Sequence, residues 1–154
     1  MIDDNNYFLA VALDGYSNDG LRVSAFDVVK QRLENSSWPL YMNTKNRKVI
    51  SRGDVIFFYI GGQGPCGGHT VGTADVVGRT DAGRRVLRDE YAVSPVSAII
   101  ELGNIRLTEP RKLKPVLIEC GIIQQENRKW GAFLMGGLCR VPEIVADKLT
   151  GRVQ

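Results

Sequence analysis

The sequence predicts an α+β fold, in which a small β-barrel of about five to six mostly antiparallel strands carries two or three flanking helices. Short apolar runs bounded by Gly, Pro and polar residues recur along the 154 residues, a pattern typical of short strands. Two other stretches combine helical spacing with capping residues. An open sheet of this size would leave exposed edges, and closure into a barrel would remove them.

The composition is that of one globular domain. A chain that is 44% apolar and 24% charged is ordinary in both respects and long enough to bury a core. We therefore expect residues 1–154 to form a single domain. No apolar run approaches the roughly 20 residues of a membrane span, and the polar start does not resemble a signal peptide. These features predict a cytoplasmic protein with no membrane contact.

The N-terminal segment predicts a strand followed by a helix. Residues 7–13 form an apolar run that ends at an Asp-Gly turn, as a buried strand does. Ser24 is suited to cap a helix, and Asp27 follows in the spacing of a capping box. We expect an amphipathic helix over residues 24–34. Trp38 then lies at the helix exit, just ahead of a proline.

The middle of the chain predicts a hairpin. Arg52-Gly53-Asp54 has the composition of a tight turn and leads into residues 55–60, which are apolar throughout. Such a strand should be covered on both faces. The glycine-rich residues 61–68 then form a flexible connection to an antiparallel strand over residues 69–78. Gly72 in that strand indicates a close backbone approach or a bulge.

The C-terminal half predicts shorter elements. We expect strands over residues 97–106 and 116–118, and an irregular segment over residues 130–138. Pro142 suits the first turn of a final helix over residues 143–149.

Few residues suggest catalysis or metal binding. Three cysteines without CxxC spacing and a single histidine argue against a disulfide framework and a zinc site. We expect no metal, no cofactor and no enzymatic activity. A Cys66–His69 nucleophile pair and an Asp14–Glu119 acid–base pair remain candidates that would need proximity in the fold.

The basic residues gather in predicted loops. The net charge of +3 permits a polyanionic partner without requiring one. Solvated loops are the simplest interpretation of any one cluster, whereas four clusters together favour a phosphate-binding surface. The clusters span residues 45–52, 79–88, 111–114 and 128–129. The candidate phosphate contacts are Lys45, Arg47, Lys48, Arg128 and Lys129.

Trp38 is a candidate wall for a ligand pocket, because a helix exit is a poor position for a core tryptophan. A nucleobase stacks on an aromatic wall for about 1–3 kcal/mol, and a buried methyl group adds about 0.8 kcal/mol. Such a pocket can prefer a methylated base, while hydrogen bonds to the base edge must set its identity.

Four short motifs carry a resemblance to a known family. They are Gly53-Asp54 ahead of a strand, Val71-Gly72-x-Ala74 within the next, Trp130-Gly131, and Val141-Pro142-Glu143 before the last helix. In this order the chain resembles, over nearly its whole length, an EVE domain, which is a member of the PUA-like superfamily related to YTH domains. The resemblance implies a pseudo-barrel whose pocket holds a modified base, such as methylated or hydroxymethylated cytosine or N6-methyladenine.

The resemblance also implies pocket positions. Trp38 falls at the principal cage tryptophan, and Tyr91 at a second aromatic of YTH domains. Where many EVE proteins have a Lys-Ser-Glu-type run for reading the base edge, this chain has Ala12-Leu13-Asp14, so its edge contacts must differ. The residues placed in the pocket by the resemblance are Leu13, Asp14, Trp38, Tyr59, Gly61 and Tyr91.

Several of these candidates have a structural alternative. Asp14 could accept from an exocyclic amine or serve only its turn, and Asn43 could bind a base edge or stabilise a loop. Tyr59 could belong to the core, and Trp130 could line the pocket or cover the open end of the barrel.

These observations predict a non-catalytic module that binds modified DNA or RNA and holds a flipped base in an aromatic pocket. A separate nuclease or other effector would then act with it. The alternatives are a PUA-type RNA-binding accessory protein without modified-base specificity, an enzyme acting on a nucleotide, and an adaptor with a peptide groove.

Overall fold

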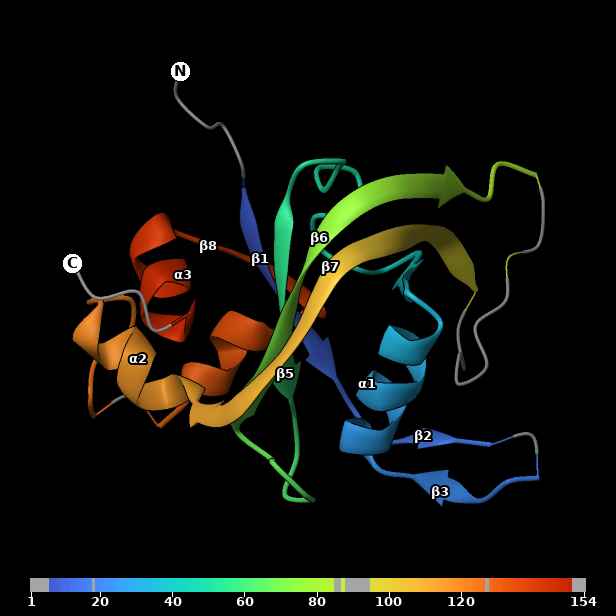
Figure 1. Cartoon of the computed structure of the whole chain (residues 1–154). Coiled ribbons are helices and arrows are strands. Elements are labelled where there is room, and N and C mark those ends of the chain that lie inside the picture. Colours follow the sequence, from blue (N-terminus) through green and yellow to red (C-terminus); the bar gives the residue numbers. More distant parts are fainter. Residues whose placement is uncertain (1–5, 18, 85–86, 88–94, 127, 151–154) are drawn as a thin grey trace.

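The computed structural model describes residues 6–17, 19–84, 87, 95–126 and 128–150. Its centre is a six-stranded mixed sheet in the order β4-β7-β6-β5-β1-β8, beside a two-stranded ribbon of β2 and β3 (Figure 1). The strands are β1 Tyr7–Ala12, β2 Gly15–Tyr16, β3 Arg22–Val23, β4 Ser37–Tyr41, β5 Val55–Ile60, β6 His69–Asp81, β7 Val96–Lys112 and β8 Leu138–Val141. The helices are α1 Ala25–Glu34, α2 Leu113–Glu119, α3 Glu143–Thr150 and the 3₁₀-helix η1 Trp130–Leu134.

The sheet has a hydrophobic core on each face. Successive residues of β1 and β5 belong to opposite cores, because side chains alternate along a strand. Phe8 and Phe58 pack on the face that carries α1, whereas Leu9 and Phe57 pack on the face that carries α2, η1 and α3. Figure 1 shows these helices on opposite sides of the strands. The prediction that residues 55–60 are covered on both faces is confirmed.

The strand pairing confirms the predicted α+β fold. Every neighbouring pair in the main sheet is antiparallel except β1 with β5, which is parallel. A parallel pair requires a long crossover connection, and here the connection contains the ribbon, α1 and β4. The sheet curls into a half-barrel, with β4 and β8 at its edges.

The long hairpin of β6 and β7 bends across the sheet (Figure 1). Its register shifts at three points, and one of them lies between Thr70 and Gly72. A Cβ atom on Gly72 would lie 2.8 Å from the carbonyl oxygen of Arg106. The close backbone approach predicted at Gly72 is therefore confirmed.

The first helix has the predicted cap. Ser24 is in extended conformation and its hydroxyl accepts a hydrogen bond from the backbone N–H of Asp27 at 3.2 Å. The turn before β5 also forms as expected, with Gly53 at a φ of 97° and the N–H of Asp54 bonded to the carbonyl of Ser51.

Two local predictions were wrong, and strand β4 was not predicted. Trp38 follows helix α1 as expected, but it lies in the edge strand β4, where the neighbouring Pro39 is tolerated. Residues 116–118 belong to helix α2, because Pro115 lies in its first turn and three residues are too few to distinguish strand from helix. Residues 130–138 are not irregular throughout, because they contain η1 and the start of β8. Gly136 and Gly137, which lie between these two elements, are residues typical of a loop.

No helix in the described part of the chain is long and apolar enough to cross a membrane.

Candidate nucleic-acid interface

A cavity of about 390 Å³ opens at the end of β1, on the face of the sheet that carries α1. Its wall is formed by the chain from β1 into the ribbon, one side of α1, the end of β4 with the residues after it, and the loop before β8. The lining residues are Val11, Leu13, Asp14, Gly15, Tyr16, Val28, Arg32, Tyr41, Asn43, Thr44, Gly136 and Gly137.

Asp14 ties the ribbon to the start of α1. Its Oδ1 accepts a hydrogen bond from the backbone N–H of Ala25 at 2.8 Å, and its Oδ2 accepts from both Nε and Nη2 of Arg22. The N–H of Ala25 and the Arg22 guanidinium together hold the pKa of Asp14 below its ordinary value. This ionised carboxylate therefore fixes the cavity wall that contains Tyr16.

Arg32 brings a positive charge to the cavity from the core side. It is 7% exposed, and its Nη2 donates to the Tyr41 hydroxyl at 3.0 Å. Its guanidinium carbon lies 4.8 Å from the ring centre of Trp38, which is within cation–π range. Trp38 and Arg32 thus form a layer behind Tyr41.

Two tyrosines supply the aromatic part of the lining, and neither was predicted from the sequence. Tyr16 is 55% exposed on the ribbon, and Tyr41 is half-buried. The register of β4 shifts between Leu40 and Tyr41, so simple alternation from Trp38 does not predict where the Tyr41 side chain points. Tyr16 directly follows the Asp14-Gly15 turn, and this position in the sequence could have identified it as a pocket residue.

The loop before β8 closes the cavity with its backbone. Gly136 and Gly137 have φ values of 97° and 80°, a region that favours glycine. The carbonyl of Gly136 accepts from the N–H of Lys45 at 2.9 Å, and that of Gly137 accepts from the N–H of Val11 at 2.8 Å. The basic loop after β4 is therefore attached directly to the cavity wall.

The predicted pocket residues divide between the two faces of the sheet. Leu13, Asp14 and Asn43 line the cavity, and a Cβ atom on Gly61 would lie 2.8 Å from the Leu13 side chain. Trp38 is 4% exposed and packs against Phe58, with ring centres 5.0 Å apart, so it is a core residue behind the cavity and does not line it.

Tyr59 and Trp130 lie on the other face. Their rings meet edge to face, with centres 6.3 Å apart, and they pack in the core beneath α2 and α3. Burial raises the pKa of Tyr59. Tyr91 lies outside the described residues.

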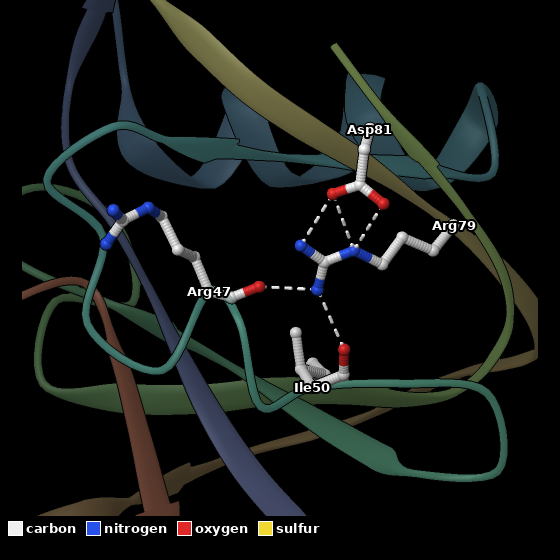
Figure 2. A network of polar contacts seen from close by, with 4 residues as sticks. All are labelled: Arg47, Ile50, Arg79 and Asp81. Atoms are coloured by element: carbon white, nitrogen blue, oxygen red, sulfur yellow. Dashed lines mark hydrogen bonds and ion pairs between the residues drawn. The ribbon is translucent and has the colours of Figure 1, made fainter. Parts of the chain in front are cut away.

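A network around Arg79 holds the basic loop in place (Figure 2). Arg79 pairs with Asp81 through Nε and Nη2, while its Nη1 donates to the carbonyls of Arg47 and Ile50. Figure 2 shows the Arg47 side chain extending away from this network. The loop that carries three predicted phosphate contacts, Lys45, Arg47 and Lys48, is thereby joined to β6.

The other two predicted phosphate contacts precede η1. Arg128 and Lys129 are exposed, and Lys129 is the N-cap residue of the 3₁₀-helix. The far end of η1 leads through Met135 into the two glycines of the cavity wall. The loop before β8 is therefore bonded to the loop after β4, and η1 connects it in sequence to Arg128 and Lys129.

The structure does not assemble either candidate catalytic pair. Glu119 pairs with Lys148 on the face of α2 and α3, whereas Asp14 lies on the face of α1. His69 directs Nδ1 to the carbonyl oxygen of Gly67 at 2.9 Å. Within the described residues, no three His, Cys, Asp or Glu side chains are placed to hold a metal ion.

No family model and no curated protein matches the sequence. Several solved structures share its fold. The YTH domain of Zygosaccharomyces rouxii MRB1, in complex with N6-methyladenosine RNA, has a TM-score of 0.56 at 10% identity and covers 98% of this chain and 88% of its own. Human THYN1, in complex with DNA containing 5-methylcytosine, has a TM-score of 0.54 at 11% identity and covers 96% of both chains.

A third similar structure is protein Atu2648 of Agrobacterium tumefaciens. It has a TM-score of 0.54 at 17% identity and covers 94% of this chain and 90% of its own. At these identities the similarity concerns the fold. The chain therefore shares the fold of these three proteins, one of which is a YTH domain.

Proposed function

We propose that this protein is a non-catalytic nucleic-acid reader that holds a flipped, modified base in the cavity at the end of β1. The observation that carries the proposal is the cavity itself, which combines aromatic side chains, polar groups and an attached basic loop. Its volume of about 390 Å³ is at the small end of ligand pockets, as a single base requires.

The energetics favour a base held between Tyr16 and Tyr41. Aromatic stacking contributes about 1–3 kcal/mol per base, and a buried methyl group adds about 0.8 kcal/mol. Extruding a base from a duplex costs a few kcal/mol. Phosphate contacts from Lys45 and Lys48 would offset that cost.

The solved structures support a modified base as the ligand. The Zygosaccharomyces rouxii YTH domain is in complex with N6-methyladenosine RNA, and human THYN1 is in complex with 5-methylcytosine DNA. Methylated or hydroxymethylated cytosine and N6-methyladenine are therefore the bases proposed for this chain. A reader without catalytic groups would work with a separate nuclease or other effector.

Trp38, Tyr59 and Trp130 have a supporting role in this proposal. Each packs in a core, so their rings would hold the sheet behind the cavity while Tyr16 and Tyr41 contact the base. Leu13 and Asn43 would contact its edge, and Asp14 would hold the wall.

The test is a titration of labelled oligonucleotides that differ only in one modified base. We expect the wild type to prefer one modification and Tyr16→Ala to lose most of that binding. Leu21→Ala is the matched control, because Leu21 is 67% exposed next to the same ribbon but does not line the cavity.

The other outcomes point to other functions. Binding that ignores the modification and survives Tyr16→Ala would favour a PUA-type RNA-binding accessory protein. If neither modified nor unmodified oligonucleotides bind, the reader proposal fails, and an enzyme or a peptide adaptor becomes the better explanation.

A further inference from the structure

A groove of about 350 Å³ lies between helix α1 and strand β7. Its lining residues are Lys30, Leu33, Glu34, Ile105 and Leu107. Val28 and Arg32 of the same helix line the cavity at the end of β1, and helical periodicity places them on the opposite side of α1 from Lys30 and Glu34. The groove and the cavity are therefore separate sites that share α1.

The floor of the groove is apolar and partly exposed. Leu33 belongs to the core and is 7% exposed, and Ile105 is half-buried against that core. Leu107 is 64% exposed and also lines the groove. A partner that covers Leu107 would remove a large apolar side chain from water, which favours binding.

The backbone of β7 has an open edge beside this floor. β4 pairs with β7 only over residues 96–101, and one further bond on this side runs from the N–H of Leu102 to the carbonyl of Ser36 at 2.8 Å. Residues 103–109 are all described, and among the described strands β6 alone pairs with them. Such an edge can pair with the backbone of another chain. Pro110 lacks an N–H, so the open edge ends there.

Two charges of opposite sign border the groove. Lys30 and Glu34 are exposed, four residues apart on α1, and neither forms an ion pair with a described residue. Lys30 lies over the Phe26 ring, 5.8 Å from its centre, which leaves its charge uncompensated. An acidic group near Lys30 and a basic group near Glu34 would complement both charges.

We propose that this groove binds an extended peptide segment of a partner protein, which adds to the open edge of β7 as a further strand. Apolar residues at alternate positions of the segment cover Ile105 and Leu107, and its charged residues face Lys30 and Glu34. In the proposed reader function, the effector protein would carry this segment. The peptide and the base can be bound at the same time, because the groove and the cavity lie on different sides of α1.

A single strand fits this site better than a second copy of the chain does. Helix α1 lies along the open edge and forms the other wall of the groove. A second copy that paired through its own β7 would bring its own α1 into the same space. The open edge over residues 103–109 also has the length of one short strand.

The experiment selects binders to the whole chain from a phage-displayed library of random linear peptides of about nine residues. We expect enriched peptides to carry β-branched or aromatic residues at alternate positions, with one acidic and one basic residue. Amide exchange in residues 103–109 should slow roughly tenfold or more when a selected peptide is bound. N-methylation at every second peptide nitrogen should abolish binding in one of the two phases and not in the other, because alternate N–H groups of a strand point to opposite sides.

Substitutions in the groove locate the site. Leu107→Asp should weaken a selected peptide roughly tenfold or more and leave oligonucleotide binding unchanged. Leu21→Asp is the matched control, because Leu21 is 67% exposed and does not line the groove. Exchange of the two charges, Lys30→Glu with Glu34→Lys, should invert the order of acidic and basic residues in newly selected peptides, which a misfolded variant would not do.

The outcomes separate this inference from the proposed function. Absence of enriched peptides, or binding that survives Leu107→Asp, would overturn the inference and leave the base reader in place. A wild-type dimer in sedimentation that becomes a monomer with Leu107→Asp would also overturn it, because the edge would then bind a second copy. Peptide binding without any oligonucleotide binding would support the groove and remove the reader function.

Discussion

Trp38 and Tyr41 lie three residues apart on β4 and have opposite environments. Trp38 is 4% exposed between Phe58 and the Arg32 guanidinium, whereas Tyr41 lines the cavity. Truncation of a buried tryptophan typically costs about 3–5 kcal/mol of stability. Trp38→Ala would therefore report on folding before it reported on ligand binding, and Tyr16 is the better position to test.

Asp14 makes folding stability depend on pH. Its folded-state pKa lies below its unfolded value because of Ala25 and Arg22. The stabilisation is therefore fully present above the unfolded pKa of about 3.9 and is lost as the pH falls through the lower folded pKa. Melting temperatures of wild type and Asp14→Asn should differ most near neutral pH and converge below about pH 4. A difference that stays constant down to pH 3 would contradict this account.

The loop after β4 acts as one unit with the β6–β7 hairpin. Its backbone is bonded to Gly136 at one end and to Arg79 at the other. Arg79 is 19% exposed, and the guanidinium beside Asp81 holds the pKa of that carboxyl below its ordinary value. This one side chain keeps the loop of Lys45 and Lys48 next to the cavity.

Substitution of Arg79 should loosen that loop. Arg79→Met leaves the carbonyls of Arg47 and Ile50 without their donor, and we expect a loss of about 1–3 kcal/mol in urea unfolding. Amide exchange in residues 47–50 should increase as well.

The matched control for Arg79→Met is Asp81→Asn. It removes the ion pair and keeps both bonds to the loop, and Asp81 is 63% exposed, so we expect a cost of about 0–1 kcal/mol. Equal effects of the two variants would show that the ion pair, and not the loop bonds, stabilises this region.

The molecule as a whole presents two different faces. Helix α1 lies on one side of the strands, and α2 and α3 lie on the other (Figure 1). The side of α1 contains the cavity, to whose wall the basic loop is bonded, and the side of α2 and α3 contains a second core. The predicted basic clusters do not form one surface, because the cluster at residues 111–114 lies where β7 ends and α2 begins. Phosphate binding should therefore depend on the clusters beside the cavity.

The salt dependence of binding tests this division. The affinity for single strands falls with salt by a slope of about 0.7 per neutralised phosphate. The double substitution Lys45→Ala and Lys48→Ala should lower the slope by roughly 1–2. The same change of charge at Lys112 and Lys114 should leave the slope near that of the wild type. A loss of slope at the second pair instead would place the nucleic acid on the face of α2.

Local patterns in the chain were sufficient for much of the fold. The cap of α1 at Ser24, the turn at Gly53 and the apolar strand over residues 55–60 each depend on residues that are close in sequence. Segments whose conformation depends on distant partners were harder to predict. Residues 138–141 form a strand by pairing with β1, which lies at the other end of the chain.

The sequence alone was enough to predict the α+β class, the strand over residues 55–60 that is covered on both faces and the polar, basic loop ahead of it, because periodicity and composition are local properties. The tertiary structure decided which residues share the cavity. Leu13, Asp14 and Asn43 meet there with Tyr16, Arg32 and Tyr41, whereas Trp38, Tyr59 and Trp130 are buried in the two cores. The physical reason is that the direction of a side chain at a strand end depends on register, and the shift between Leu40 and Tyr41 is set by pairing with β7, more than 50 residues away.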